Sequence, residues 1–88
     1  MKINMEPCWA YVNSTPLKQA IHIKREADEV LDALHSNDSP GADMEVMDVI
    51  QSCVTYLVIR GFSQDTVDKL AAEMHDKNDA RGYYKKGE

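Results

Sequence analysis

Four acidic residues between positions 26 and 48 have the spacing that a hard metal cation needs. Glu26 and Glu29 form an E-x-x-E pair, and Glu45 and Asp48 form an E-x-x-D pair further along. Residues three apart on a helix are neighbours on its surface, so each pair directs two carboxylates the same way. Carboxylate oxygens in this number suit Mg²⁺ or Mn²⁺, whereas Zn²⁺ prefers nitrogen and sulfur. The pattern predicts a Mg²⁺ site, with Mn²⁺ as a substitute, where the two pairs meet.

The two pairs are not equally informative about a metal. Acidic residues three apart are common on solvated helices, so Glu26 and Glu29 alone say little. Glu45, near a helix start, suits the helix dipole even without a ligand. However, Glu45 and Asp48 lie on the polar stripe of an otherwise apolar helix, where an unpartnered charge is costly. The second pair therefore favours a site over a merely solvated surface.

Three helices are predicted to position these carboxylates. Thr15-Pro16 and Ser39-Pro40 each place a capping hydroxyl before a proline, which is typical of a helix start. Gly61 is suited to end the second helix in the left-handed conformation, and Ser63 is placed to cap a third. The sequence thus predicts an all-α, antiparallel bundle of three main helices. These helices span about 16–34, 40–60 and 63–77.

The second predicted helix is apolar on nearly all sides. A narrow polar stripe runs along it, formed by Glu45, Asp48, Gln51, Ser52 and Thr55. A three-helix monomer can hardly bury the rest, so we expect the helix at 40–60 to meet a second copy in a homodimer or homotetramer. Met44, Met47 and Met74 are predicted as core or interface residues. The predicted core face of the first helix comprises Ala20, Ile23, Ala27, Val30, Leu31 and Leu34.

Length and charge limit the functions that the chain can have. Its 88 residues predict one domain, with an N-terminal segment at 1–15, a helical core at 16–77 and a flexible tail at 78–88. The formal charge of −5 argues against nucleic acid as a partner. We expect no disulfide between Cys8 and Cys53, a buried and reduced Cys53, no membrane partner and a cytoplasmic location. Trp9 and Tyr11 are expected to cover an open edge of the bundle.

These features together resemble the MazG-type nucleoside triphosphate pyrophosphohydrolases, and small phage-type members in particular. The resemblance covers about residues 17–84. It rests on Glu26-Ala-Asp-Glu29, on Glu45-Val-Met-Asp48 with the apolar run that follows, on Gly61-Phe-Ser63, and on Lys77-Asn-Asp-Ala-Arg81. One departure is Arg25, which stands where the family often has a leading glutamate.

The resemblance implies an activity: Mg²⁺-dependent hydrolysis of nucleoside triphosphates to the monophosphate and pyrophosphate. It implies that Glu26, Glu29, Glu45 and Asp48 hold the metal. Glu29, with Glu26 beside it, is the implied catalytic group that takes the proton of the attacking water. The implied substrate-binding residues are Lys77, Asn78, Arg81 and Tyr84.

Several alternatives stay open at the level of sequence. The chain could be a non-catalytic helical module that oligomerises or binds a partner through its second helix. Phosphoribosyl-ATP pyrophosphohydrolase is a second enzymatic alternative, although the N-terminal segment does not resemble that group. Lys77 fits a solubilising charge cluster equally well. His22 is predicted as a surface histidine, and the aromatic residues Trp9, Tyr11, Tyr83 and Tyr84 are expected to pack more often than to stack on a base.

Overall fold

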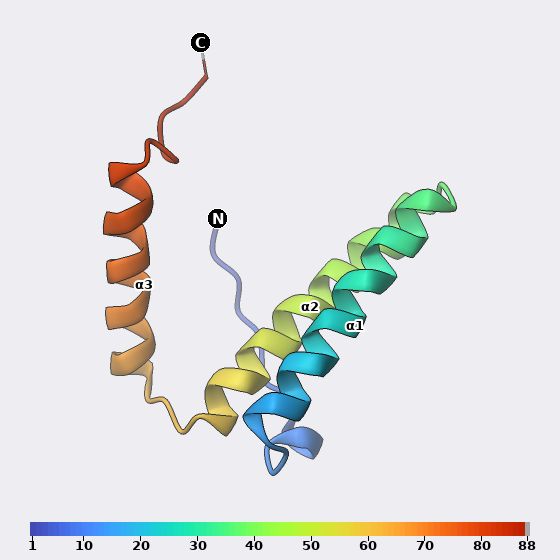
Figure 1. The fold of residues 1–88 in the computed structure, drawn as a ribbon, viewed down its shortest axis with the longest axis horizontal. Coiled ribbons are helices and arrows are strands. Elements are labelled where there is room, and N and C mark those ends of the chain that lie inside the picture. Colours follow the sequence, from blue (N-terminus) through green and yellow to red (C-terminus); the bar gives the residue numbers. More distant parts are fainter. Residues whose placement is uncertain (88) are drawn as a thin grey trace.

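A computed structural model describes residues 1–87, and every regular element in that range is helical. A short 3-10 helix, η1 (Trp9–Tyr11), precedes α1 (Pro16–His35), α2 (Ser39–Ile59) and α3 (Gln64–Ala80) (Figure 1). The predicted all-α class with three main helices is confirmed. Each helix also lies within a few residues of its predicted position.

Two of the predicted helix caps are present. The Thr15 hydroxyl accepts a hydrogen bond from the backbone N–H of Lys18 at 3.2 Å, and the Ser63 hydroxyl accepts one from Thr66 at 3.3 Å. Gly61 has a φ of 72°, in the left-handed region that glycine adopts without a Cβ clash. Local sequence chemistry therefore sets the start of α1, the end of α2 and the start of α3.

Two predicted helix ends are wrong. The cap of α2 is Asp38, whose Oδ1 accepts from the Gly41 N–H at 3.0 Å, and Ser39 is the first helical residue. Asp is as good a cap as Ser, and Pro40 is tolerated anywhere in the first turn because its missing N–H has no helical partner there. Helix α3 continues past Lys77 to Ala80, because no residue before Gly82 stops it.

Helices α1 and α2 form an antiparallel hairpin, and α3 leaves it. Figure 1 shows α1 and α2 side by side along their length, while α3 turns away after Gly61 and stands apart. Asn37, with a φ of 57°, makes the tight reversal between α1 and α2.

Within the described residues, none of the helices is long and apolar enough to cross a membrane.

The contact between α1 and α2 is more polar than predicted. Ala42 is the only hydrophobic residue of the described range that is buried, and the other buried residues are polar: Gln19, Ser52 and Thr55. The Gln19 amide donates to the Ser52 carbonyl oxygen at 3.0 Å across the hairpin. The α1 face that meets α2 therefore includes Gln19. The predicted core positions of Ala20, Ala27, Leu31 and Leu34 are wrong, because these residues are exposed. Ile23 and Val30 from the same predicted face are half-buried.

The methionines that were expected in a core or an interface lie on the outside of the single chain, so they are not core residues of one copy and the interface stays a prediction. Met44 is 66% exposed and Met74 is 52% exposed, and Met47 is exposed as well. Cys53 is exposed, so its predicted burial is wrong, and both Cys53 and Cys8 are free thiols. Trp9 is 62% exposed and does not cover an edge of the hairpin. Much apolar surface is thus left without a partner.

Candidate metal centre

Three of the four predicted metal ligands lie together between α1 and α2. Glu26 and Glu29 come from α1 and Glu45 comes from α2, and one carboxylate oxygen of each lies within 4.8 Å of the others. The helical spacing of three places Glu26 and Glu29 side by side, and the tight reversal at Asn37 returns α2 so that Glu45 faces them. We call these three residues the acidic triplet.

Asp48, the fourth predicted ligand, lies beside the triplet but is not part of it. It is exposed, one turn after Glu45 on α2. Its negative charge raises the pKa values of both Glu26 and Glu45, so it contributes to the same local field. Asp48 and Glu26 also line a cavity of about 210 Å³ between the helices, which we call the polar cavity.

Glu45 has the most perturbed environment of the triplet. Its pKa is raised to about 7, first by the hydrogen bond that a protonated Glu45 would share with the Glu29 carboxylate, then by desolvation and by the charges of Glu29, Asp48 and Glu26. Its Oε2 atom is inaccessible and has no hydrogen-bond partner among the described residues. A buried carboxylate oxygen without a partner is costly, and a proton or a cation would relieve the cost.

Glu26 is paired with a histidine. Burial and the charge of Glu29 raise the pKa of Glu26, while His22 opposes the shift. The His22 Nε2 lies 3.2 Å from the Glu26 Oε1, and the His22 ring packs edge-on against Tyr11 at 5.9 Å. The His22 side chain is 37% exposed, so it lies at the surface as predicted, although its contact with Glu26 was not. Its spacing of four residues from Glu26 was the sequence signal for this pair.

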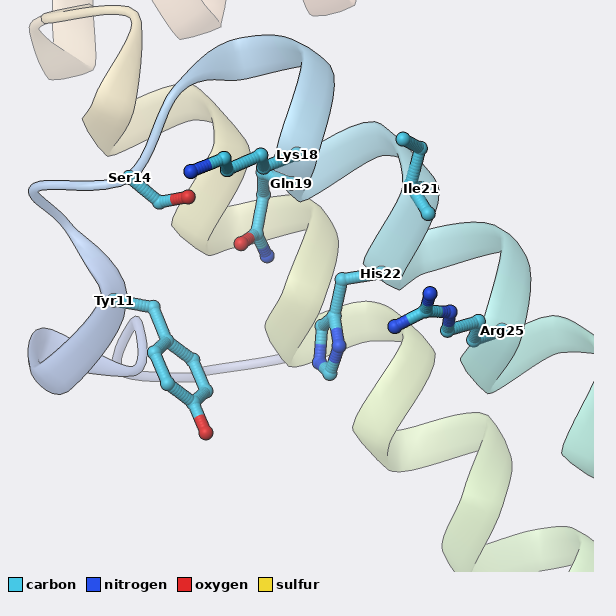
Figure 2. Close-up of a pocket in the computed structure, with 7 residues that line it drawn as sticks. All are labelled: Tyr11, Ser14, Lys18, Gln19, Ile21, His22 and Arg25. Atoms are coloured by element: carbon cyan, nitrogen blue, oxygen red, sulfur yellow. The ribbon is translucent and has the colours of Figure 1, made fainter.

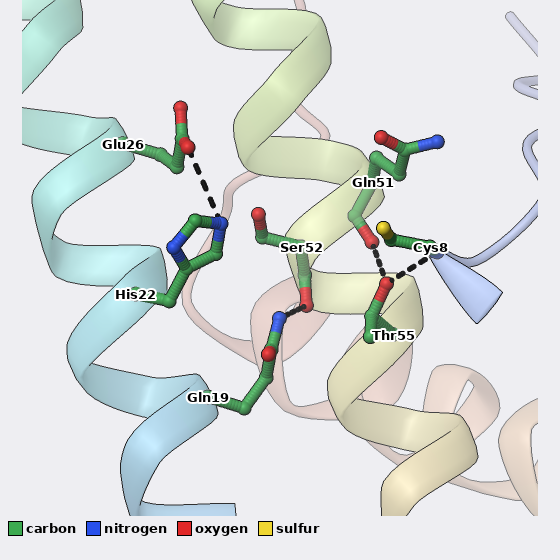
Figure 3. A network of polar contacts seen from close by, with 7 residues as sticks. All are labelled: Cys8, Gln19, His22, Glu26, Gln51, Ser52 and Thr55. Carbon is green, nitrogen blue, oxygen red and sulfur yellow. Dashed lines mark hydrogen bonds and ion pairs between the residues drawn. The ribbon is translucent and has the colours of Figure 1, made fainter. Parts of the chain in front are cut away.

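A polar network fixes the wall of the polar cavity (Figure 3). The Thr55 hydroxyl accepts from the Cys8 N–H at 2.8 Å and donates to the Gln51 carbonyl oxygen at 2.8 Å. These two hydrogen bonds of Thr55, together with the bond from Gln19 to Ser52, join α1, α2 and the N-terminal segment. Sequence reasoning missed these contacts as part of a site, although the polar stripe of α2 was a signal for them.

The four residues predicted to bind substrate lie elsewhere in the single chain. Lys77 and Asn78 belong to the last turn of α3, and Arg81 caps its end. Tyr84 stacks on His75 of the same helix, with ring centroids 4.3 Å apart. Because α3 stands apart from the hairpin (Figure 1), one chain does not bring these residues to its own acidic triplet. Substrate binding by them stays a prediction.

The chemistry of the triplet fits a hard divalent cation. Its donors are all carboxylate oxygens, and one of them, Oε2 of Glu45, lacks a partner. Within residues 1–87, no Lys or Arg forms an ion pair with the triplet, and His22 is the one basic residue in contact. No protein-family model, curated protein or solved structure matches this chain.

Proposed function

We propose that the protein is a Mg²⁺-dependent nucleoside triphosphate pyrophosphohydrolase. The observation that supports this function is the acidic triplet, in which carboxylates from two helices lie within 4.8 Å without a Lys or Arg to neutralise them. The resemblance to MazG-type enzymes supplies the reaction: cleavage between the α and β phosphorus atoms of the substrate. We also place the protein in the cytoplasm, where its substrates would be found.

Each carboxylate has a role in this proposal. Glu26, Glu29 and Glu45 would hold Mg²⁺, or Mn²⁺ in its place, and Asp48 would add negative charge from the next turn of α2. The metal would neutralise substrate phosphates and lower the pKa of a bound water. Glu29 is the most suitable general base, because it is the exposed member of the triplet and can reach a water on the substrate side. His22 orients Glu26 through their contact at 3.2 Å.

A second copy of the chain is part of the proposal, because one copy is too open to be a complete fold. The chain exposes 7141 Å², whereas a folded monomer of this length exposes about 5,200 Å². Its radius of gyration is 15.1 Å, against about 12 Å for a compact chain. If each of two copies buried its excess over this value, roughly 3,900 Å² of accessible surface would be buried in total, which lies in the range of permanent homodimers.

The apolar surface indicates where the second copy would bind. A groove of about 420 Å³ lies between the N-terminal segment, the end of α2 and the start of α3, lined by Ile50, Val54, Leu57 and Phe62 among others. Leu70 and Met74 of α3 are exposed and share the helix face of Val67, which lines the groove, so they extend its apolar surface toward a second copy. In such an assembly α3 of one copy would have to carry Lys77, Asn78, Arg81 and Tyr84 to the triplet of the other.

A non-catalytic helical module is the second candidate function. The observation that favours it is the same exposed apolar surface, because a surface of this kind marks a protein interaction site whether or not the triplet is catalytic. In this alternative the chain would oligomerise or bind a partner through α2, and the acidic triplet would only share a proton.

Hydrolysis in ¹⁸O-labelled water separates the two functions. Purified protein with Mg²⁺ is screened for pyrophosphate release from ribo- and deoxynucleoside triphosphates, and the products are analysed by mass spectrometry. Attack at the α phosphorus places the label in the monophosphate, as we expect. Glu29→Gln and Glu45→Gln should abolish release, while Asp43→Asn, on the exposed side of α2, should not. Absence of release from every substrate by folded protein would favour the module.

A further inference from the structure

A second cavity with two cationic side chains lies next to the polar cavity. It has a volume of about 330 Å³ and is lined by Tyr11 and Ser14 from the N-terminal segment and by Lys18, His22 and Arg25 from α1. Lys18, His22 and Arg25 are spaced by four and three residues, so they share one face of the helix. Figure 2 shows them on one side of the space, with the Tyr11 ring across from α1. We call this space the cationic cavity.

The charges of Lys18 and Arg25 are not used by other side chains. Within residues 1–87 neither forms an ion pair, whereas Lys24 on the same helix pairs with Asp28 at 3.3 Å. Glu26, the carboxylate that follows Arg25 on α1, contacts His22 instead. Isolated surface cations are common and need no ligand, but these two line one concave space with Tyr11 and Ser14, Lys18 at its Ser14 end and Arg25 beside His22 (Figure 2). In a chain of charge −5, two cations that line one space give it a local positive potential, which favours an anion.

The cationic cavity adjoins the acidic triplet through shared walls. Tyr11, Gln19 and His22 line both the cationic and the polar cavity, and the polar cavity continues to Glu26 and Asp48. The two cavities are thus neighbours, and Glu26 is the member of the triplet that lines the second one. A ligand with several phosphate groups can therefore contact the cations at one end and the triplet through a metal at the other.

We infer that Lys18 and Arg25 bind the β- and γ-phosphates of the substrate in the cationic cavity, on the same chain as the acidic triplet. The inference rests on the proposed function, which defines the substrate as a nucleoside triphosphate. The Arg25 guanidinium suits two oxygens of one phosphate, and the Lys18 ammonium acts as a point charge. This pair does not depend on α3, whereas Lys77 and Arg81 lie on the helix that leaves the hairpin.

Calorimetric titration with inorganic pyrophosphate, in the presence of Mg²⁺, tests the pair directly. Lys18→Gln and Arg25→Gln should each weaken pyrophosphate binding about tenfold or more, as expected for loss of a charge-assisted hydrogen bond. Arg25→Lys should recover part of the affinity because it keeps the charge. Lys24→Gln is the matched control, with the same charge change on α1, and should bind as the unaltered protein does. Lys18, Lys24 and Arg25 are all exposed, so these substitutions should leave the fold intact. Helix content measured by circular dichroism checks this.

The outcomes separate this inference from the proposed function. Unchanged pyrophosphate affinity in Lys18→Gln and Arg25→Gln, or no binding by the unaltered protein, overturns the inference. If the unaltered protein and both variants hydrolyse triphosphates with the same KM, the proposed function stands and the phosphate site is elsewhere. If both variants lose pyrophosphate binding while no triphosphate is hydrolysed by the unaltered protein, the anion site stands and the proposed function fails.

Discussion

The pKa of about 7 for Glu45 predicts that magnesium binding releases a proton. A carboxyl group with this pKa is mostly protonated at pH 6 and mostly ionised at pH 8. A metal ligand must be in the carboxylate form, so binding at the acidic triplet should release a proton at pH 6 and much less at pH 8. The pKa of Glu26 is raised as well and shifts the release in the same direction.

Isothermal titration in buffers of different ionisation enthalpy measures this proton release. The observed binding enthalpy changes linearly with the buffer enthalpy, and the slope is the number of protons released. Glu45→Gln should bind Mg²⁺ more weakly and lose the release at pH 6, whereas Asp43→Asn, at an exposed position of α2 outside the triplet, should behave as the unaltered protein does. A slope near zero at pH 6, or an unchanged slope in Glu45→Gln, would show that the metal does not displace the Glu45 proton.

Three further predictions concern the fold that holds the triplet. The pKa of Glu45 rises from 4.5 to about 7 on folding, so without metal the folded chain binds more protons than the unfolded chain between these pH values. The Tm should therefore fall as the pH rises from 4.5 to about 7. The Glu45→Gln substitution should make the Tm less dependent on pH. Thr55→Val should cost about 1–3 kcal/mol in urea unfolding, because it leaves the Cys8 N–H without its acceptor; an unchanged midpoint would contradict this. Gly61→Ala should lower the free energy of unfolding by roughly 1 kcal/mol, because the φ of Gly61 is 72° and the added methyl group gains no packing contact within 4 Å. Gly87→Ala is the control and should be neutral, because Gly87 has no positive φ and has open space around it.

The sequence was sufficient for the helices and for the meeting of the acidic residues. Caps such as Thr15 and Ser63 act over three or four residues, so local chemistry alone places the starts of α1 and α3. The meeting of Glu26 and Glu29 with Glu45 required only helical spacing and a short connection, both of which can be recognised in the sequence.

Other features depended on contacts that no local pattern specifies. The core face of α1 was predicted on the assumption of an apolar interior, but Ser52 and Thr55 of the polar stripe are buried, and the Gln19 amide donates to the main-chain carbonyl oxygen of Ser52. His22 was correctly assigned to the surface, but its place in the wall shared by the two cavities was not predicted. The position of α3 depends on the chain leaving the hairpin after Gly61, and periodicity in α3 itself carries no information about that direction.

Electron paramagnetic resonance of Mn²⁺ is the most direct test of the central claim, which is that the acidic triplet holds a divalent cation. Free Mn²⁺ gives a sharp six-line signal that is lost on binding, so a titration counts bound ions. We predict binding by the unaltered protein and by Asp43→Asn, and weakening of at least about tenfold in Glu45→Gln, since even the loss of a group that supports a metal ligand costs that much. Equal Mn²⁺ binding by Glu45→Gln and Asp43→Asn, or none by the unaltered protein, would contradict the claim.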